Sequence, residues 1–408
     1  MIVIETARLA KKAMGELLSL SEDQRTAALQ SISRALLAHS SEILKENAKD
    51  LAAAMSSQLS VSLIDRLTLD QKALEGLSLM CLQVSKQPQV VGLIVEEYTR
   101  PNGLLIQKQR IPLGVIGMVF ESRPNVIADG AALAIKSGNA IILKGGKEAI
   151  HSNKILFETI SRAVEGILPA GSLSMIETRS DVDELLKLHE YIDLMVPRGG
   201  SSLIKYVKEH ATMPVVAHDK GLCHLFVNDD ALVENVIPVV LNAKTQRPGV
   251  CNALETLLIH QDYPQKEKLL TALLEKNVEV RGCATAQKIN PRIRPATEKD
   301  YFNEYLDQII SLKIVGSLDE AISHIKAHTS HHTEAILTQD SKAMEKFLNS
   351  LDASALIINA STRFNDGGEL GLGAELGIST SKLHAYGPMG AKEMTTTRFL
   401  VTGTGQIR

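Results

Sequence analysis

The stretch GVIGMVFESRPNVIADGAALAIKSGNAIILKGG, residues 114–146, has two short apolar runs with an alanine-rich run between them. We predict strands over residues 114–121 and 139–146, because each run is short and apolar. The intervening residues 125–138 predict a helix. Strand, helix and strand in succession form a βαβ unit, which places both strands parallel in one sheet.

The same alternation continues toward the C-terminus. Further helices are predicted over residues 147–168, 181–191 and 201–211, and further strands over residues 172–178 and 192–197. The pattern predicts an α/β fold with a parallel sheet that helices cover on both faces. Ligands of such sheets bind at the carboxyl ends of the strands. We therefore expect a binding site in the turns after Lys144 and Pro197.

A second α/β region begins near Leu225. It has a helix before Cys251 and then five predicted strands, over residues 255–260, 278–283, 309–316, 333–340 and 354–360. The first hundred residues read as helices, one of which starts with the capping-box pair Ser21 and Gln24.

Two extended runs within residues 90–112 flank Asn102-Gly103. Asn-Gly predicts a hairpin with a type I′ turn, because both residues tolerate positive φ. No partner strand is near in the sequence, so the hairpin is expected to form an arm. Residues 394–408 are rich in β-branched residues and predict a terminal strand.

The composition excludes several classes of protein. A chain of 408 residues is too long for one compact core, so more than one domain is expected. Its share of hydrophobic residues, 44%, and of charged residues, 22%, is ordinary for a globular protein. Aromatics are 3%, tryptophan is absent and net charge is −3, which disfavours nucleic-acid binding. Four cysteines without CxxC spacing favour a reducing compartment. With no signal-peptide pattern and no apolar stretch of about 18 residues, we expect a cytoplasmic protein.

Cys251 stands apart from the other cysteines. Cys81, Cys223 and Cys283 lie in apolar runs and read as buried small residues. Cys251 follows an Arg-Pro-Gly corner, where Arg247 supplies the positive potential that a thiolate nucleophile needs. Taken alone, Cys251 is compatible with a nucleophile or with a turn residue, and His218, His224 and His260 are unassigned as partners.

Three further patterns are ambiguous by themselves. Gly199 and Gly200 allow close backbone approach, and Ser201 is predicted to cap a helix whose N-terminus favours an anion such as a pyrophosphate; a plain turn fits as well. Lys144 is placed to reach a ribose or a 2′-phosphate, or to extend to solvent. The histidine tract of residues 323–332 lacks zinc-ligand spacing, so we expect no metal.

Together these residues resemble the aldehyde dehydrogenase superfamily. The likeness rests on PLGVIGMVFESRPNV, VPRGGS, NAKTQRPGVCNALET and GGELGLGAELGISTSKLHAYGPMG, and it covers nearly the whole chain. It implies a doubly wound Rossmann-type cofactor domain, a smaller α/β catalytic domain and oligomerisation arms. We expect residues 1–94 and 110–225 to form the NADP-binding domain, residues 226–384 the catalytic domain, and residues 95–109 and 385–408 the hairpin and C-terminal arm.

The resemblance also implies roles for single residues. Cys251 matches the nucleophile and Asn125 the oxyanion-binding asparagine, although two residues are inserted before Asn125. Lys144 matches the cofactor lysine, and Glu304 the glutamate that holds the nicotinamide ribose. The residues themselves suggest a phosphate role for two arginines near these positions, Arg123 and Arg247.

The sequence departs from hydrolytic members of the superfamily at AHDKGLCH, residues 217–224. Those enzymes carry a glutamate base where His218 or Asp219 stands here. Without that base a thioester would persist until phosphate attacked it. The resemblance thus implies NADPH-dependent reduction of L-glutamyl 5-phosphate, with the kinase that makes this acyl phosphate as functional partner and a homo-oligomeric assembly. The alternatives are a hydrolytic or CoA-acylating aldehyde dehydrogenase, a thiol hydrolase and a non-catalytic nucleotide-binding module.

Overall fold

The computed structural model describes residues 2–217 and 220–408. The chain divides into two compact units. The first comprises Met1–Ala217, Gly371–Gly377 and Leu383–Arg408, and the second comprises His218–Leu370 and Ile378–Lys382. No helix in the described ranges is both long and apolar enough to cross a membrane.

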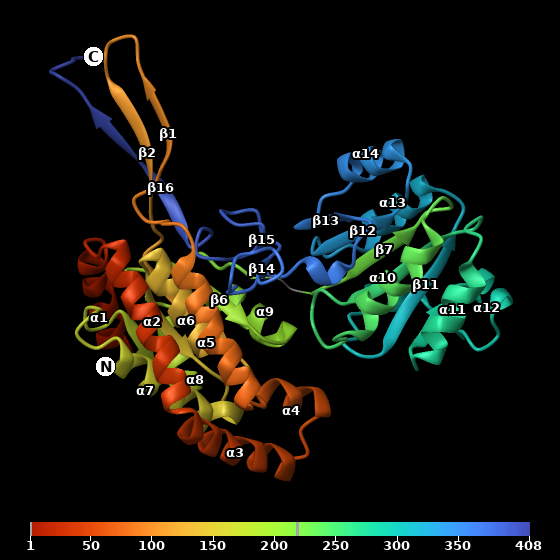
Figure 1. Cartoon of the computed structure of the whole chain (residues 1–408), viewed down its shortest axis with the longest axis horizontal. Helices are drawn as coiled ribbons and strands as arrows, with labels where there is room; N and C mark the ends of the chain where they lie inside the picture. The colour runs from red at the N-terminus through yellow and green to blue at the C-terminus, as the bar shows by residue number, and fades with distance from the viewer. Residues whose placement is uncertain (1, 218–219) are drawn as a thin grey trace. The chain divides into compact units, whose positions relative to one another are not determined.

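Five helices open the first unit, as predicted (Figure 1). They are α1 (Ile2–Leu17), α2 (Glu22–Ala38), α3 (Ser40–Ser56), α4 (Val61–Leu67) and α5 (Gln71–Lys86). The capping box before α2 is confirmed: the Ser21 hydroxyl accepts the Gln24 N–H at 3.2 Å, and Gln24 Oε1 accepts the Ser21 N–H at 2.9 Å.

A four-stranded parallel sheet forms the centre of the first unit, in the order β5-β4-β3-β6. Its strands are β3 (Val115–Phe120), β4 (Ala140–Lys144), β5 (Leu173–Met175) and β6 (Leu194–Arg198). The helices that alternate with them are α6 (Val126–Ser137), η1 (Lys147–Ala149), α7 (Ile150–Ala163), α8 (Arg179–Leu185) and α9 (Ser201–His210). The predicted βαβ alternation is confirmed.

Helices cover both faces of this sheet. Ile116 and Met118 of β3 pack in one hydrophobic cluster with α2, α5, α6 and α7, whereas Val115 and Val119 pack in another with α1, α8 and α9. The chain leaves β3 toward β4 on one side, while β6 lies on the other side. The carboxyl ends of β3 and β6 therefore flank the point where the winding reverses, which is where open α/β sheets bind ligands.

The second unit contains a seven-stranded parallel sheet, in the order β10-β9-β11-β8-β7-β12-β13. Its strands are β7 (Cys223–Val227), β8 (Leu254–His260), β9 (Glu279–Gly282), β10 (Arg294–Pro295), β11 (Ile309–Val315), β12 (Thr333–Leu337) and β13 (Ala355–Ile358). Its helices are α10 (Val233–Thr245), α11 (Lys266–Glu275), α12 (Ala284–Ile289), η2 (Glu298–Phe302), α13 (Leu318–His328), α14 (Ser341–Ser350) and η3 (Thr362–Phe364). The chain passes from the first unit to the second at residue 218 rather than at the predicted 226, because a boundary there would cut β7 in two.

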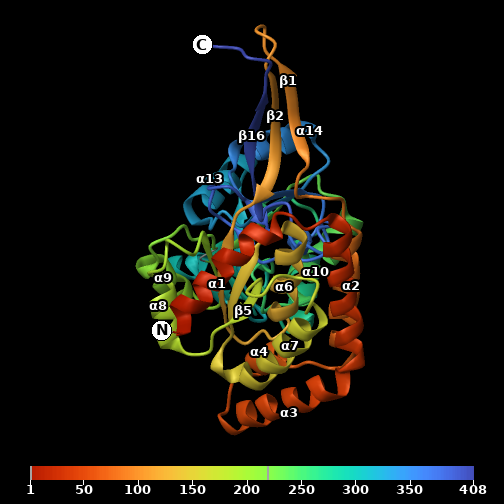
Figure 2. The ribbon, with the colours of Figure 1, turned by 90° about the vertical axis from the view of Figure 1, so that its left-hand side faces the viewer.

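The predicted hairpin is present, and it has a partner strand. β1 (Ile94–Thr99) pairs antiparallel with β2 (Leu105–Pro112), and β2 pairs antiparallel with β16 (Thr395–Thr402) near the C-terminus. Figure 2 shows these three strands side by side. The chain also forms the short strands β14 (Ile378–Ser379) and β15 (Gly387–Pro388).

The prediction of a type I′ turn at Asn102-Gly103 is wrong. Only Gly103 has positive φ, at 85°, whereas Asn102 does not. The Arg100 carbonyl accepts the Gly103 N–H at 2.9 Å, so Pro101 and Asn102 are the two central residues of the turn. Proline fixes a negative φ at the first of them, which a type I′ turn does not allow.

Candidate active site

Cys251 lies in the turn between α10 and β8 and is partly exposed. The thiols of Cys81 and Cys223 are buried, and burial raises the pKa of Cys81 to about 12 and that of Cys223 well above its ordinary value. Cys283 is partly exposed rather than buried as predicted, and its Sγ accepts the Ile314 N–H at 3.4 Å. A buried thiol with a raised pKa is a poor nucleophile, which leaves Cys251 as the best-placed reactive cysteine.

Two neighbouring residues hold the backbone of Cys251. A β-carbon on Gly221 would stand 1.9 Å from the Cys251 carbonyl oxygen, so only glycine fits here without a shift. The same carbonyl oxygen accepts a hydrogen bond from Cys223 Sγ at 3.1 Å. The segment before β7 is thus packed directly against the turn that carries the candidate nucleophile.

Glu304 belongs to the same cluster, since its Oε1 accepts the Gly221 N–H at 2.9 Å. A buried ion pair fixes the segment that follows Glu304. Lys244 Nζ lies 3.2 Å from Glu255 Oε2, and both side chains are essentially inaccessible to water. Glu255 also accepts the Tyr305 and Leu306 N–H groups at 3.2 and 3.3 Å. Burial raises the pKa of Glu255 to about 7 and lowers that of Lys244.

The Arg363 guanidinium lies in electrostatic reach of the candidate nucleophile. Burial lowers the pKa of the Arg363 guanidinium, the charges of Asp366 and Cys251 oppose that shift, and Arg247 adds to it by repulsion. Asp366, Cys251 and Arg247 are therefore each in electrostatic reach of Arg363. Arg363 Nε donates to Gln246 Oε1 at 2.8 Å. A pocket of about 260 Å³ opens beside this group, lined by Asn242, Gln246, Arg363, Phe364, Asp366 and Glu369.

Cys251 and Glu304 precede strands β8 and β11, and Gly221 precedes β7. The site of the second unit therefore lies at the amino edge of its sheet. The binding site expected at the carboxyl edge of the first sheet stays a prediction, and the candidate residues of the second sheet lie at the opposite edge. Hydrogen bonds between loops, such as that from Gly221 to Glu304, build this edge instead.

In the first unit, Asn125 stands at the start of α6, after the end of β3. Its Nδ2 donates to Asp129 Oδ2 at 2.8 Å and does not cap the helix. Burial raises the pKa of Asp129 to about 7, and Arg198, Asn125 and Arg123 oppose that shift. The predicted residues Asn125 and Arg123 thus share one charged group, which we call the Asp129 cluster: Arg123, Asn125, Asp129, Arg198 and Glu375.

Lys144 ends β4, as predicted, and is half-buried. Burial lowers the pKa of its ammonium, while the carboxylates of Glu148 and Glu121 oppose the shift, and Arg179 lies near enough to add to it. Glu148 is itself held by the N–H and hydroxyl of Ser122, at 2.6 and 2.7 Å.

The prediction that Ser201 caps α9 is wrong. Gly200 is the N-cap residue, no side chain caps the helix, and Ser201 is its first residue and exposed. Glu121 Oε2 accepts the Gly200 N–H at 2.8 Å, and a β-carbon on Gly199 would stand 2.3 Å from the same oxygen. The two glycines do permit close approach to the helix N-terminus, but a carboxylate of the chain occupies that position here.

Histidines of the tract at residues 323–332 contact one another and a nearby glutamate. The rings of His324 and His328 stack with centroids 4.1 Å apart, and burial lowers the pKa of His324 to about 2. His328 Nε2 lies 2.8 Å from Glu298 Oε1. Within residues 2–217 and 220–408, no group of three or more potential ligands is arranged to hold a metal ion. His218 and Asp219, the expected replacements for a hydrolytic base, lie outside the described residues.

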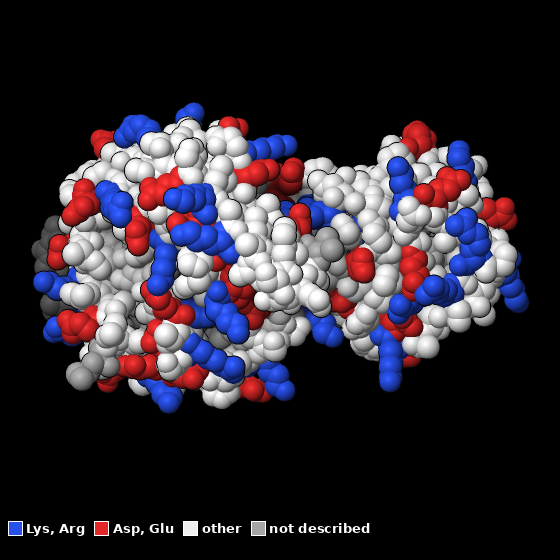
Figure 3. All heavy atoms as spheres, turned by 90° about the horizontal axis from the view of Figure 1, so that it is seen from below, with Lys and Arg blue, Asp and Glu red and all other residues white. Residues whose placement is uncertain are grey.

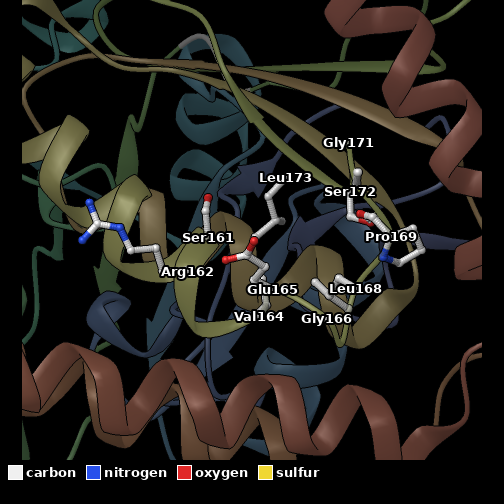
Figure 4. A pocket seen from close by; sticks show the side chains of 11 residues that line it. Ser161, Arg162, Val164, Glu165, Gly166, Leu168, Pro169, Gly171, Ser172 and Leu173 are labelled. Atoms are coloured by element: carbon white, nitrogen blue, oxygen red, sulfur yellow. Dashed lines mark hydrogen bonds between the residues drawn. The ribbon is translucent and has the colours of Figure 1, made fainter.

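A larger pocket of about 360 Å³ lies in the first unit (Figure 4). Its lining residues run from the last turn of α7 to the amino end of β5: Ser161–Arg162, Val164–Gly166 and Leu168–Leu173. β4 and β5 are parallel, so this pocket is at the opposite edge of the sheet from Lys144. It shares no lining residue with the candidate site.

The family model described as "Aldehyde dehydrogenase family" matches residues 3–310. The chain belongs to the aldehyde dehydrogenase family. Within that family it is similar over its whole length to gamma-glutamyl phosphate reductases: it is 46% identical over 413 residues to that of Xanthomonas oryzae pv. oryzae, covering 100% of both chains. It is 47% identical over 414 residues to that of Carboxydothermus hydrogenoformans, covering 100% of this chain and 99% of the relative.

The crystal structure of gamma-glutamyl phosphate reductase from Thermotoga maritima matches with a TM-score of 0.95 and 41% identity. That match covers 100% of this chain and 99% of the other. The predicted family fold, with its Rossmann-like parallel-sheet domain, is therefore confirmed.

Sequence reasoning missed several residues that the structure places in these clusters: Glu121, Asp129, Arg198, Arg363 and Glu375. Arg198 lies within the quoted VPRGGS motif and Asp129 one helical turn after Asn125. Those two had a usable signal in the sequence. Arg363 is more than a hundred residues from Cys251, and no local pattern connects them.

Proposed function

We propose that this chain reduces L-glutamyl 5-phosphate to L-glutamate 5-semialdehyde and phosphate, with NADPH as reductant. One observation carries the proposal: the partly exposed cysteine of the family motif lies in a turn within electrostatic reach of Arg363. Positive charge favours the thiolate, which is the nucleophilic form. The full-length similarity to gamma-glutamyl phosphate reductases supports the choice of substrate.

The first step uses Cys251. Its thiolate attacks the C5 carbonyl carbon of the acyl phosphate, an S–C bond forms, and the C–O bond to phosphate breaks, giving a thioester and free phosphate. We assign the binding of the leaving phosphate to Arg247 and Arg363, since a guanidinium matches phosphate oxygens as a bidentate fork. In the second step the thioester carbonyl accepts a hydride, and the resulting oxyanion expels the Cys251 thiolate to release the aldehyde.

Oxyanion stabilisation falls to Asn125 and to the Cys251 N–H. The Asn125 amide has two hydrogens, and its bond to Asp129 uses one of them. The second hydrogen is available to an oxyanion. Hydrogen-bond donors fixed in this way lower the barrier because they need no reorganisation when charge develops.

The first unit fits a nicotinamide dinucleotide at the carboxyl edge of its sheet. Lys144 presents a half-buried ammonium with the Arg179 guanidinium nearby, and two cations suit the 2′-phosphate of NADP. Glu121 and Glu148 offer acceptors for ribose hydroxyls, and Glu304 offers one for the nicotinamide ribose. A pyrophosphate at Gly199 and Gly200 would take the N–H that Glu121 now accepts. When bound, the cofactor supplies the hydride.

The rival is a hydrolytic or CoA-acylating aldehyde dehydrogenase of the same fold. The sequence favours phosphate, because His218 or Asp219 stands where hydrolytic members of the superfamily carry the glutamate that activates water. The test is NADP⁺ reduction by L-glutamate 5-semialdehyde, with and without inorganic phosphate. We expect turnover that requires phosphate. Turnover that is equal without phosphate, or that requires CoA, would support the rival.

A further inference from the structure

The Asp129 cluster contains a carboxylate that is poorly satisfied. Asp129 is partly buried, and among the described residues its only hydrogen bond comes from Asn125 Nδ2 to Oδ2, at 2.8 Å. A carboxylate has about four acceptor sites, so Oδ1 retains capacity for a donor. Removal from water with so few partners is the cause of its raised pKa. An added cationic donor would restore the missing stabilisation.

Arg198 supplies an opposite charge in the same cluster, because it ends β6, which pairs with β3, and Asp129 lies on the helix that follows β3. Arg198 is the strongest electrostatic stabiliser of the ionised Asp129, and its Nη1 lies 3.7 Å from Glu375 Oε1, which is longer than a hydrogen bond. The two side chains of that pair are only 16% and 18% exposed. Gly377 makes room for the guanidinium, since a β-carbon there would stand 2.8 Å from Arg198 Nη1. In the described ranges the Arg198 guanidinium has this ion pair and no side-chain hydrogen bond, so it keeps donors for a ligand.

A carboxylate and a guanidinium in one cluster match an α-amino acid group, in which an ammonium and a carboxylate share one carbon. In the proposed substrate that carbon is three carbon–carbon bonds of about 1.5 Å from the reacting C5 carbonyl. Asn125, the proposed oxyanion donor, lies four residues before Asp129, a rise of about 6 Å along the helix. Their side chains meet at 2.8 Å, so this end of one helix can contact neighbouring parts of one small substrate.

We propose that Asp129 binds the α-ammonium and Arg198 the α-carboxylate of the substrate, so that this pair selects α-amino acid derivatives over other acyl phosphates and aldehydes. This inference rests on the proposed function. Charge-assisted hydrogen bonds of this kind are directional and strong, and a site that pairs a buried charge rejects analogues that leave the charge unpaired.

The experiment compares three aldehydes in the phosphate- and NADP⁺-dependent direction: L-glutamate 5-semialdehyde, 5-oxopentanoate, which lacks the amino group, and 4-aminobutanal, which lacks the carboxylate. For Asp129→Asn we expect kcat/KM for the first aldehyde to fall about 10- to 100-fold, mainly through KM. For 5-oxopentanoate it should change less than about threefold. For Arg198→Met we expect kcat/KM for L-glutamate 5-semialdehyde to fall in the same way, while kcat/KM for 4-aminobutanal changes little, so the preference between these two aldehydes is lost. Asp23→Asn, an exposed acid in the first turn of α2, is the control.

NADPH binding by fluorescence shows whether each variant is folded. Equal losses for all three aldehydes in both variants mean that Asp129 and Arg198 only position Asn125, and this overturns the inference. If one of the two variants does not fold, the aldehyde preferences of the other variant test the inference. If the unaltered protein oxidises none of the aldehydes, the proposed function fails; if it does so and both variants keep its preferences, only this inference fails.

Discussion

Gly221 and Cys251 touch backbone to backbone, with 1.9 Å between the Cys251 carbonyl oxygen and the place where a Gly221 β-carbon would be. The Gly221 N–H is bonded to Glu304, so this contact connects the candidate nucleophile to the proposed ribose-binding glutamate. The geometry of Cys251 therefore depends on a residue thirty positions earlier in the chain.

Gly221→Ala should lower kcat about 100-fold, because the new methyl group must displace the Cys251 turn by about an ångström. Steady-state kinetics and thermal unfolding are the measurements. Gly15→Ala in α1 is the control, since nothing lies within 4 Å of a β-carbon there. An alanine variant with unaltered kcat would show that the turn shifts without consequence.

Arg247→Lys should raise the KM for phosphate in the aldehyde-oxidising direction about tenfold or more, because lysine cannot reproduce the bidentate fork. The KM for NADP⁺ should change little, and Cys251 should be alkylated more slowly at neutral pH. Arg292→Lys, an exposed arginine in the same unit, is the control. If the phosphate KM is unaltered in both Arg247→Lys and Arg123→Lys, the phosphate binds elsewhere.

The β1-β2-β16 sheet should hold an oligomer together. Phe399 and Val401 on β16 are 61% and 58% exposed, and β1 and β16 form its two outer edges. Exposed apolar strands at sheet edges pair with other chains. We expect Phe399→Glu with Val401→Glu, or deletion of the hairpin around Gly103, to reduce the mass measured by light scattering. An unaltered protein with the mass of one chain would contradict this prediction.

Acidic and basic side chains are mixed on the surface drawn in Figure 3. The clusters with consequences for function are small and partly buried, which makes their titration informative.

Asp129 predicts a pH dependence of stability. Its folded pKa of about 7 exceeds the ordinary 3.8, so the folded state takes up a proton as pH falls through 7. The fold is therefore relatively more stable at pH 5 than at pH 8. The groups that face Asp129 are Arg198, Arg123, Glu375, Asn125 and Cys81.

Asp129→Asn removes this titration. At pH 8 the variant should exceed the unaltered protein in free energy of unfolding by about 1–2 kcal/mol, allowing for partial solvent screening. The difference should shrink toward pH 5. Urea unfolding at both values measures it, and a difference that grows as pH falls would reverse the assigned direction.

The sequence predicted the elements well and the contacts between distant loops poorly. The βαβ pattern is local, so strands such as β3 and β4 were placed within a residue or two. Cys251 was found because the Arg-Pro-Gly corner interrupts an apolar pattern. The contact of Glu121, which follows β3, with the N-terminus of α9 was not predicted, because its bond to Gly200 spans 79 positions. The turn type predicted at Asn102-Gly103 was wrong because Pro101, with its fixed negative φ, is the first central residue of the turn.

The central claim is a glutamyl thioester on Cys251. Its most direct test is the intact mass of the protein after incubation with L-glutamate 5-semialdehyde and NADP⁺ without phosphate, followed by an acid quench that protonates the substrate amine. We predict one glutamyl adduct on the peptide that contains Cys251, lost when phosphate is added before the quench. The adduct should be absent from Cys251→Ser, which still binds NADPH, and present in Cys81→Ser and Cys283→Ser. An adduct on another cysteine, or one that persists in Cys251→Ser, would contradict the claim.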